Sequence, residues 1–417
     1  MPDALPICPH CETTRGALGD TCPEAACARR GYRFIPHGWY ATARDAAARR
    51  NKPLDPLIGR SLDRYLLAGK LGEGGMGAVY VALQRPLMRE VAIKVVSGLD
   101  LTEATIARFE REARAVATLD HPNIVKLHDY GVGELEAQEG QGADAPVRVR
   151  MPYMALEYLR NAHSIRRVLA QAREEAGGSH SAAVVLSVFE QVLNALTAAH
   201  SAGIVHRDVK PDNVMVVSVP GNRFHVKVLD FGLAKLVSEV SGGGEDAEIT
   251  RTGQLLGTPF YMAPEQAPGP NRGEVDARTD LYAVAVMLYE VFTGVRPFQG
   301  DSALEVISLK IDPDYRPLDR AEARGLPRGL RSFLARGLAC RPGDRFASAD
   351  EMAAALRHAV SGRVTTAIGL AAGGGGSSED PSIAYPSLGG TPSPASPGSP
   401  PASPATLRED EPRASQG

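Results

Sequence analysis

The distribution of apolar and polar residues predicts a region rich in strands at the start of the folded part of the chain. Residues 65–84 form two apolar runs joined by glycines, and residues 89–97 form a third run, as neighbouring β-strands do. In residues 102–119 apolar side chains recur every three or four positions. This spacing indicates an amphipathic helix, for which Thr102 is a suitable N-terminal cap.

The pattern continues with two more strands and then with long helices. Residues 123–132 and 149–159 have the pattern of strands, and the polar residues 133–147 between them are expected to form a loop. Residues 181–203 and 278–294 are long and largely apolar, as buried helices are. The layout predicts an α+β fold in which a small sheet lobe with one helix precedes a larger, mostly helical lobe.

The composition changes at both ends of this region. Residues 1–38 contain four of the five cysteines, and residues 39–61 are expected to be a linker, helical through its alanines until two prolines end it. Residues 362–417 are dominated by glycine, proline and serine, so this tail is predicted to be disordered. The predicted folded domain spans residues 62–361, with lobes at 62–159 and 160–361.

Charge and hydropathy indicate neither a polyanionic partner nor a membrane. The formal net charge is −3, so neither nucleic acid nor an acidic membrane surface is indicated. The most apolar windows, residues 182–199 and 281–292, are interrupted by Glu190 and Glu290, and no membrane span is expected. The N-terminus lacks the basic start and apolar run of a signal peptide. A reducing, cytoplasmic location is therefore expected.

A glycine-rich stretch lies between the first two predicted strands. Gly72, Gly74 and Gly77 have the spacing G-x-G-x-x-G, which lets backbone N–H groups approach a phosphate chain closely. Dinucleotide-binding folds use the same spacing, but there the glycines open a helix. Here strands flank them, and the sequence VAIK at 91–94 puts Lys94 on the next strand, facing the glycines. The alternative is a glycine-rich hairpin with a surface lysine.

A carboxylate on the amphipathic helix is expected to hold this lysine in place. Glu112 lies on that helix, and a carboxylate from a neighbouring helix can orient a lysine that is aimed at phosphates. Glu110 is a competing candidate on the same helix. We expect Glu112 to pair with Lys94, and the alternative for either glutamate is a solvated helix face.

Five motifs in a fixed order resemble those of the bacterial eukaryotic-like (Hanks-type) serine/threonine protein kinases. They are GEGGMGAV at 72–79, VAIK at 91–94, HRDVKPDN at 206–213, DFG at 230–232 and APE at 263–265. The resemblance covers residues 62–361 and implies the two-lobed protein kinase fold, with an antiparallel sheet in the small lobe. It also implies Mg²⁺-dependent transfer of the γ-phosphoryl group of ATP to serine or threonine hydroxyls of protein substrates in intracellular signalling.

The resemblance assigns catalytic roles to a few residues. Asp208 would accept or orient the proton of the substrate hydroxyl, and Lys210 would steady the transferred phosphoryl group. Asn213 and Asp230 would hold Mg²⁺, a hard cation that favours oxygen ligands. Thr258 would stand beside Asp208. Because no motif is degraded, an active enzyme is favoured over the alternative, a nucleotide-binding scaffold that recruits partners.

The same resemblance implies the nucleotide contacts. Four apolar side chains, those of Leu71, Val79, Ala92 and Met215, would sandwich the adenine. Leu156 would be the gatekeeper, and Glu157 and Leu159 would offer backbone hydrogen bonds at the hinge. The full set of expected ATP-binding residues is Leu71, Gly72, Glu73, Gly74, Gly75, Met76, Gly77, Val79, Ala92, Lys94, Glu112, Leu156, Glu157, Leu159, Met215 and Asp230.

The segment between DFG and APE is rich in glycine and polar residues and holds candidate phosphorylation sites. Thr250 and Thr252 are spaced like the activation-loop threonines of bacterial kinases. We hypothesise that autophosphorylation of one or both orders the segment through an ion pair with Arg207. The alternative is that they are plain loop threonines.

Further positions match structural residues of the family. Asp280 is expected to brace the catalytic loop, and Arg345 is expected to pair with Glu265. His206 would be a packed histidine that supports the loop. Cys340, far from the other cysteines, is expected to be a small buried hydrophobe.

The four N-terminal cysteines suggest a zinc-ribbon-like module. Two residues separate Cys8 from Cys11, and four separate Cys22 from Cys27, which suits a tetrahedral Zn²⁺ site with four thiolates. His10 could replace one thiolate. A cysteine-bearing unfolded arm is the alternative, and a redox C-x-x-C pair is disfavoured because no strand–helix unit surrounds it. So small a module would not fold without its metal.

The two ends of the chain are candidate binding segments for partner proteins. The cysteine module could bind a partner or regulate the neighbouring kinase. The tail contains several Ser-Pro and Thr-Pro pairs, so it could be phosphorylated or bind a partner, although a passive tail is equally expected. A third hypothesis, in which the module binds nucleic acid, lacks a strong basic patch.

Overall fold

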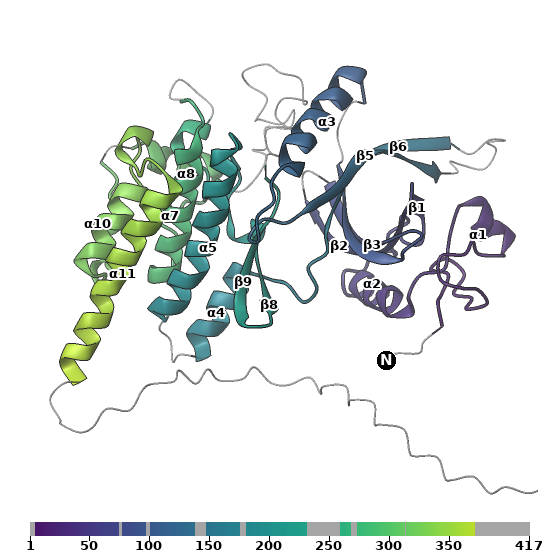
Figure 1. Ribbon diagram of the computed structural model, residues 1–417, viewed down its shortest axis with the longest axis horizontal. Helices are drawn as coiled ribbons and strands as arrows, with labels where there is room; N and C mark the ends of the chain where they lie inside the picture. Colours follow the sequence, from purple (N-terminus) through teal and green to yellow (C-terminus); the bar gives the residue numbers. More distant parts are fainter. Residues whose placement is uncertain are drawn as a thin grey trace, which may run out of the picture. The chain divides into compact units, whose positions relative to one another are not determined.

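The computed structural model describes residues 5–74, 77–96, 101–137, 147–175, 181–231, 259–267, 273–312 and 314–371. Those up to residue 369 cluster into one unit. Along the chain this unit consists of the N-terminal cysteine module, a sheet-rich small lobe and a helical large lobe (Figure 1).

An antiparallel sheet forms the small lobe, as the sequence predicts. Its strand order is β1-β2-β3-β4-β6-β5. The strands are β1 (Ser61–Leu62), β2 (Tyr65–Gly74), β3 (Gly77–Gln84), β4 (Arg89–Val96), β5 (Leu127–Ala137) and β6 (Val147–Glu157). Neighbouring strands pair in register, with Val79 opposite Lys94 and Ala92 opposite Leu156, so residues expected to meet a nucleotide lie on adjacent strands.

The predicted loop at residues 133–147 is wrong at both ends. Strand β5 continues through Ala137, and β6 begins at Val147. Leu135 is only 3% exposed because it packs in the core of the sheet. A Cβ atom on Gly133 would lie 2.8 Å from Leu62 Cδ1, so glycine permits the close approach of β5 to β1. One buried leucine among polar residues is too sparse a pattern to reveal a strand.

The predicted amphipathic helix packs on the small-lobe sheet. Helix α3 (Glu103–Ala117) begins where Thr102 Oγ1 accepts a hydrogen bond from Thr105 N at 3.2 Å, which confirms the predicted cap. Its buried residues Phe109 and Ala113 pack against Val96 and neighbouring strand residues. Helix α3 therefore has the amphipathic character that its spacing predicts.

The large lobe is built around two buried helices, α5 (Ala182–Ser201) and α7 (Ala277–Thr293). Asp276 caps α7 at its start, and Gly294, with φ of 80°, ends it in the left-handed conformation. A small sheet with β7 (His163–Ser164), β8 (Val214–Val219) and β9 (Asn222–Val228) carries the catalytic loop. The other helices are α4 (Ile165–Glu175), α8 (Ala303–Ile311), α9 (Ala321–Arg324), α10 (Arg328–Gly337) and α11 (Ala349–Ala371).

By length and composition alone, α5 could cross a membrane. Its residues Val185, Val188, Phe189 and Leu193 are fully buried in the core of the large lobe. Packing on several sides requires an apolar helix, so this core position accounts for its composition.

Residues 39–61 are not a free linker, because they pack on the small lobe. Helix α1 (Ala25–Arg29) belongs to the cysteine module, and α2 (His37–Arg49) lies against β2. Tyr40 and Ile58 share an apolar cluster with residues on both sides of them, which are Ile7, Ile35, Leu66, Ala68, Val81 and Leu83. The predicted alanine-rich helix does form, but it is part of the folded unit.

The last helix of the large lobe crosses the predicted C-terminal end of the domain. Helix α11 runs through Ala371, beyond the predicted domain end at 361. Residues 372–417, which make up nearly all of the predicted tail, lie outside the described residues.

Candidate active site

One buried carboxylate, that of Asp280, holds the backbone of the catalytic loop HRDVKPDN in place. Asp280, at 1% exposure, accepts hydrogen bonds from His206 N at 2.9 Å and from Arg207 N at 2.8 Å. His200 Nε2 lies 2.8 Å from the same carboxylate. These bonds fix Arg207 in the left-handed conformation, with φ of 68°. The prediction that Asp280 braces this loop is confirmed.

Two polar residues of the loop converge on one carboxylate oxygen of a third residue, Asp208. Lys210 Nζ lies 2.6 Å from Asp208 Oδ2, and Asn213 Nδ2 donates to the same oxygen at 3.0 Å. Asn213 Nδ2 also donates to Asp208 O at 2.8 Å. The Asp208 side chain is 33% exposed, so it is oriented by its neighbours and is still open to solvent. A carboxylate held this way can accept a proton from an incoming hydroxyl.

His206 joins the catalytic loop to the segment that carries Asp230. It is fully buried, its Nε2 lies 2.7 Å from Leu229 O, and its ring is tilted against Phe231 with centroids 4.6 Å apart. Leu229 N donates to Asn213 O at 2.8 Å. The backbone turns sharply at Asp230, where φ is 60°. His206 is thus the packed, supporting histidine that the sequence predicts.

Lys94 and Asp230 meet across the two lobes. Lys94 Nζ lies 2.7 Å from Asp230 Oδ2, and the lysine is only 6% exposed. This excludes the alternative of a surface lysine. Residues 136 positions apart in the chain therefore meet between the two lobes, as a positive and a negative group.

The expected pairing of Lys94 with Glu112 does not form in this conformation. Within the described residues, the ion pair of Lys94 is with Asp230, and Glu112 Oε1 lies 3.4 Å from Arg111 Nη2. Two carboxylates compete for one ammonium group, and the turn at Asp230 brings its carboxylate within contact distance. The nucleotide-binding role of Glu112 stays a prediction.

The glycine-rich stretch forms the turn between β2 and β3. Gly72 pairs with Val79 and Gly74 with Gly77, whose φ is 131°. Cβ atoms added at Gly72 and Gly74 would meet no atom of the described residues within 4 Å, so no described side chain covers their backbone. Glu73 between them is exposed, whereas Gly75 and Met76 lie outside the described residues. Small residues there allow a phosphate chain to approach the backbone.

The expected adenine contacts lie on strands of both lobes. Ala92 is buried, Leu71 is 46% exposed, and Val79 and Met215 have intermediate exposure. Leu156, on β6 beside Ala92, is also half-buried. Partly exposed apolar side chains on facing strands suit a flat apolar ligand.

The hinge follows β6, and one of its expected backbone donors is already engaged. Glu157 N donates to Lys126 O at 2.8 Å, which leaves the carbonyl of Glu157 for the predicted hinge contact. Its carboxylate pairs with Lys227 Nζ at 2.8 Å. Leu159, the other expected hinge residue, is half-buried just beyond the strand.

Comparison with known families agrees with this geometry. The sequence profile of the family described as "Protein kinase domain" matches residues 65–359. The chain belongs to the protein kinase family. The matched kinase domain contains both lobes and every motif named above, and it leaves out the cysteine module and the tail.

The chain is similar to bacterial serine/threonine-protein kinases. The chain is 37% identical over 312 residues to the serine/threonine-protein kinase pkn3 of Myxococcus xanthus, covering 74% of this chain and 52% of that protein. It is 38% identical over 304 residues to PknL of Mycobacterium tuberculosis, covering 72% and 67%. The chain spans about half or less of the length of the first three curated relatives.

A solved structure is also similar. The kinase domain of Mycobacterium tuberculosis PknI shares 26% sequence identity with this chain, with a TM-score of 0.49. The match covers 72% of this chain and 98% of that one.

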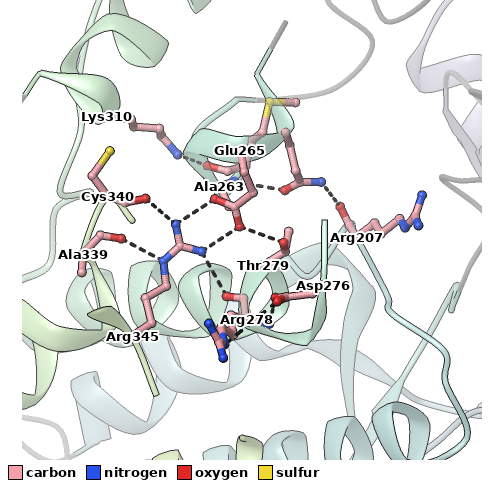
Figure 2. Close-up of polar contacts among 12 residues, drawn as sticks. Arg207, Ala263, Glu265, Asp276, Arg278, Thr279, Lys310, Ala339, Cys340 and Arg345 are labelled. Atoms are coloured by element: carbon pink, nitrogen blue, oxygen red, sulfur yellow. Dashed lines mark hydrogen bonds and ion pairs between the residues drawn. The ribbon is translucent and has the colours of Figure 1, made fainter. Parts of the chain in front are cut away.

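Arg345 and Glu265 anchor the segment that follows the activation region of the kinase domain. Arg345 Nη1 and Nη2 lie 2.7 and 2.8 Å from the two oxygens of Glu265 (Figure 2). Arg345 also donates to the carbonyls of Ala339 and Cys340, and Thr279 Oγ1 donates to Glu265 at 2.8 Å. The predicted pair is confirmed. Burial alone would raise the pKa of Glu265, but Arg345 and Thr279 outweigh it and hold this pKa below its usual value.

Cys340 is exposed, so the expectation of a buried hydrophobe is wrong. Its backbone carbonyl faces inward to accept from Arg345 Nη2 at 2.8 Å, as Figure 2 shows. The need to satisfy a buried guanidinium therefore orients this residue.

Two further contacts fix residues 259–267, and sequence reasoning missed both. The buried Lys310 Nζ donates to Phe260 O at 2.8 Å and to Met262 O at 2.5 Å. Tyr261 OH donates to Glu290 Oε2 at 2.5 Å. A lysine inside the apolar run VISLKI of α8 is the signal that could have revealed the first contact.

This segment also reaches the catalytic loop. Gln266 Nε2 donates to Arg207 O at 2.8 Å (Figure 2). Thr250, Thr252 and Thr258 precede it and lie outside the described residues. Their predicted roles stay predictions.

The four N-terminal cysteines converge in a separate site. Their sulfur atoms all lie within 4.8 Å of one another, and Cys11 Sγ is 3.6 Å from Cys22 Sγ, far beyond a disulfide bond. Burial raises the pKa of Cys22 to about 11. His10 is not a member of the sulfur cluster: its Nδ1 lies 3.3 Å from Cys27 Sγ and its ring stacks on Tyr32.

Proposed function

We propose that this chain is a serine/threonine protein kinase that transfers the γ-phosphoryl group of ATP to hydroxyl groups of proteins. The observation that carries the proposal is the convergence of Asp208, Lys210 and Asn213 in a loop that is hydrogen-bonded to Leu229, next to the Asp230 that pairs with Lys94. The similar curated bacterial proteins named above are serine/threonine-protein kinases.

The residues of the catalytic loop divide the work of the transfer. Asp208 is oriented by Asn213 and accepts the proton of the attacking hydroxyl, since its carboxylate is held in place while the side chain stays 33% exposed. Lys210, 2.6 Å from that oxygen, lies where it can offset negative charge on the transferred phosphoryl group. Lys94 contributes a second, buried positive charge on the small-lobe side. Catalysis is then mainly positioning and charge stabilisation.

The donor atoms present fit a magnesium ion. Because Asn213 Nδ2 is committed to Asp208, its Oδ1 is the atom available to a cation, and Asp230 offers a carboxylate. Oxygen donors of this kind are those Mg²⁺ prefers. When bound with ATP, the ion would be held by Asn213 and Asp230 and would supply positive charge that offsets the charge of the phosphates.

The test is phosphate transfer by the purified full chain. We expect transfer of label from γ-labelled ATP to protein in the presence of Mg²⁺, with phosphoserine and phosphothreonine as products identified by mass spectrometry. Asp208→Asn, which keeps the side-chain shape, should abolish transfer while nucleotide still binds. Nucleotide binding without any transfer by the wild-type chain would favour a scaffold.

We also propose that phosphorylation of Thr250 or Thr252 activates the enzyme. In support, the guanidinium of Arg207 has no acidic partner among the residues that the structure describes, although its loop is rigidly held. A phosphate on the activation segment would supply that partner. Mapping phosphosites in the wild-type chain and in Asp208→Asn tests this: equal phosphorylation of both proteins would exclude autophosphorylation.

A further proposal is that the cysteine cluster binds structural Zn²⁺. Tetrahedral thiolate coordination at about 2.3 Å separates the sulfurs by about 3.8 Å, which agrees with the observed convergence of the four sulfurs. Metal analysis of the purified chain should find one zinc per chain, and its absence from metal-replete protein would refute the site.

Partners and location remain proposals of the same kind. The cysteine module and the proline-rich tail are the segments outside the kinase domain that could bind a partner protein. A cluster of free thiols is typical of a reducing compartment, which supports a cytoplasmic location. Co-purification with chains that lack either segment, and cell fractionation, would test these proposals.

A further inference from the structure

The segment that joins the cysteine module to the sheet places one carboxylate beside the glycine-rich hairpin. Asp55, which lies outside the region matched by the family profile, pairs through Oδ2 with Lys70 Nζ at 3.0 Å. The same oxygen accepts from Tyr80 OH at 3.1 Å, and Oδ1 accepts from Leu57 N at 3.0 Å. The Asp55 side chain is only 16% exposed, so it is fixed between its own segment and the β2–β3 hairpin.

Lys70 carries this contact into the hairpin. Its Nζ also lies 2.9 Å from Glu73 Oε2, and Glu73 stands between Gly72 and Gly74. Lys70 directly precedes Leu71, and the pairing of β2 with β3 is irregular between Lys70 and Gly72. The ammonium group of Lys70 thus links the irregular part of the β2–β3 hairpin to the carboxylate of Asp55, which lies outside the hairpin.

The cysteine module, in turn, lies directly against the segment that holds Asp55. A Cβ atom on Gly59 would lie 2.3 Å from Pro9 Cγ, so this glycine packs directly on the turn between Cys8 and Cys11. Arg33 N donates to Gly59 O at 2.7 Å, and Gly59 N donates to Leu67 O on β2 at 2.7 Å. The module, the segment and β2 therefore form one continuous set of contacts.

We propose that Asp55 is a positioning residue for the glycine-rich hairpin, and that through it the N-terminal cysteine module sets the affinity of the kinase domain for ATP. The inference rests on the proposed function for the identity of the nucleotide. A hairpin whose strands are already held in place loses less freedom when a ligand binds against them, so the contact favours binding. For a partly exposed ion pair the expected effect is about two- to fivefold in the Kd for ATP.

The experiment compares Asp55→Asn with Asp45→Asn in the full chain. Asp45 is exposed on α2, so the control makes the same chemical change and removes the same charge nearby. The Kd of a fluorescent ATP analogue with Mg²⁺ is measured by titration, which needs no phosphate transfer. We expect a two- to fivefold rise for Asp55→Asn and none for Asp45→Asn. Equal Kd values for both variants would overturn the proposal.

A double-mutant cycle distinguishes positioning from a general loss of stability. Lys70→Met removes the other charge, so the double variant Asp55→Asn/Lys70→Met should bind no more weakly than Lys70→Met alone. Tyr80→Phe keeps the ion pair and should leave the Kd unchanged. Additive effects of Asp55→Asn and Lys70→Met would show that Asp55 does not act through Lys70. In steady-state assays, KM for ATP should rise while KM for the protein substrate stays constant.

The module is tested by Cys27→Ser in the same titration. We expect a weakening of the Kd at least as large as that of Asp55→Asn, and no further effect of Asp55→Asn in that background. An unchanged Kd in Cys27→Ser would show that the cysteine module does not affect the hairpin. If Cys27→Ser unfolds the small lobe, the proposal is judged by the Kd values of the Asp55 and Lys70 variants alone. If the wild-type chain transfers phosphate but Asp55→Asn leaves the Kd for the ATP analogue unchanged, this inference is refuted and the proposed function stands.

Discussion

Arg345 and Glu265 form a buried two-pronged ion pair, although 80 positions separate them in the chain. Their side chains are 0% and 3% exposed. Arg345 comes from the segment before α11, and Glu265 from the APE motif beside the catalytic loop. The pair therefore couples the far end of the large lobe to the residues next to the active site.

Removal of Arg345 is expected to be strongly destabilising. Arg345→Met leaves the Glu265 carboxylate buried without a countercharge, which typically costs about 3–5 kcal/mol. The free energy of unfolding in urea measures the loss. Lys126→Met is the matched control, because its pair with Asp120 is exposed and should contribute less than about 1 kcal/mol. Losses of similar size in both variants would contradict this assignment.

The pair also predicts how stability depends on pH. Since the folded-state pKa of Glu265 is held below its usual value of 4.5, the unfolded chain binds the proton more tightly. The stabilisation is fully present above that value and is lost as pH falls through the folded-state pKa. The stability gap between wild type and Glu265→Gln should be constant near neutral pH and narrow below about pH 4.5. Denaturation midpoints of both proteins, measured across this pH range, give the stability gap. A gap that widens in acid would contradict a lowered folded-state pKa of Glu265.

The Lys94–Asp230 pair predicts loss of activity from either side. Lys94→Met and Asp230→Asn each remove a charged group from the cleft, and phosphate transfer should fall by about 10²–10³-fold or more. Initial rates with labelled ATP provide the measurement, and circular dichroism checks that each variant is folded. A folded Lys94→Met chain with wild-type rates would show that this lysine does not act on the nucleotide.

The cysteine cluster predicts a metal-dependent part of the fold. Cys27→Ser should lose bound zinc and lower the melting temperature, because so small a module depends on its metal. Cys340→Ser, which changes an exposed cysteine outside the cluster, should keep the metal and the wild-type melting temperature. Zinc content by atomic spectroscopy and thermal unfolding test both variants together.

Substitution of Lys310 is expected to lower the free energy of unfolding, because two carbonyl acceptors lose their donor. Lys310→Met would leave the carbonyls of Phe260 and Met262 without this donor, at about 1–3 kcal/mol for each buried group that stays unsatisfied. Relief of the buried charge offsets part of this loss, since burial lowers the pKa of Lys310 well below its usual value. Chemical denaturation should show a net loss, and a more stable variant would mean that the charge outweighs its bonds.

Much of the architecture was predictable because local patterns encode it. Alternation and glycine spacing located β2, β3 and β4, and the recurrence of apolar residues after Thr102 located α3. The pattern failed where a single buried residue was the only signal, as with Leu135 at the end of β5. The pattern also failed for residues 39–61, which pack on the small lobe. A helix in a linker and a helix packed on a sheet can have similar compositions, and they differ mainly in their contacts with distant residues.

The sequence by itself determined the inventory of chemistry: a carboxylate, a lysine and an asparagine in one short loop, a lysine on a strand, and four cysteines near the N-terminus. Local spacing and motif order suffice for this, because the reaction demands particular side-chain types. Only the tertiary structure decided which groups meet. Lys94 faces Asp230 rather than Glu112, and Asp55 reaches Lys70, because such contacts depend on long-range packing and on backbone turns such as that at Asp230, which no local pattern specifies.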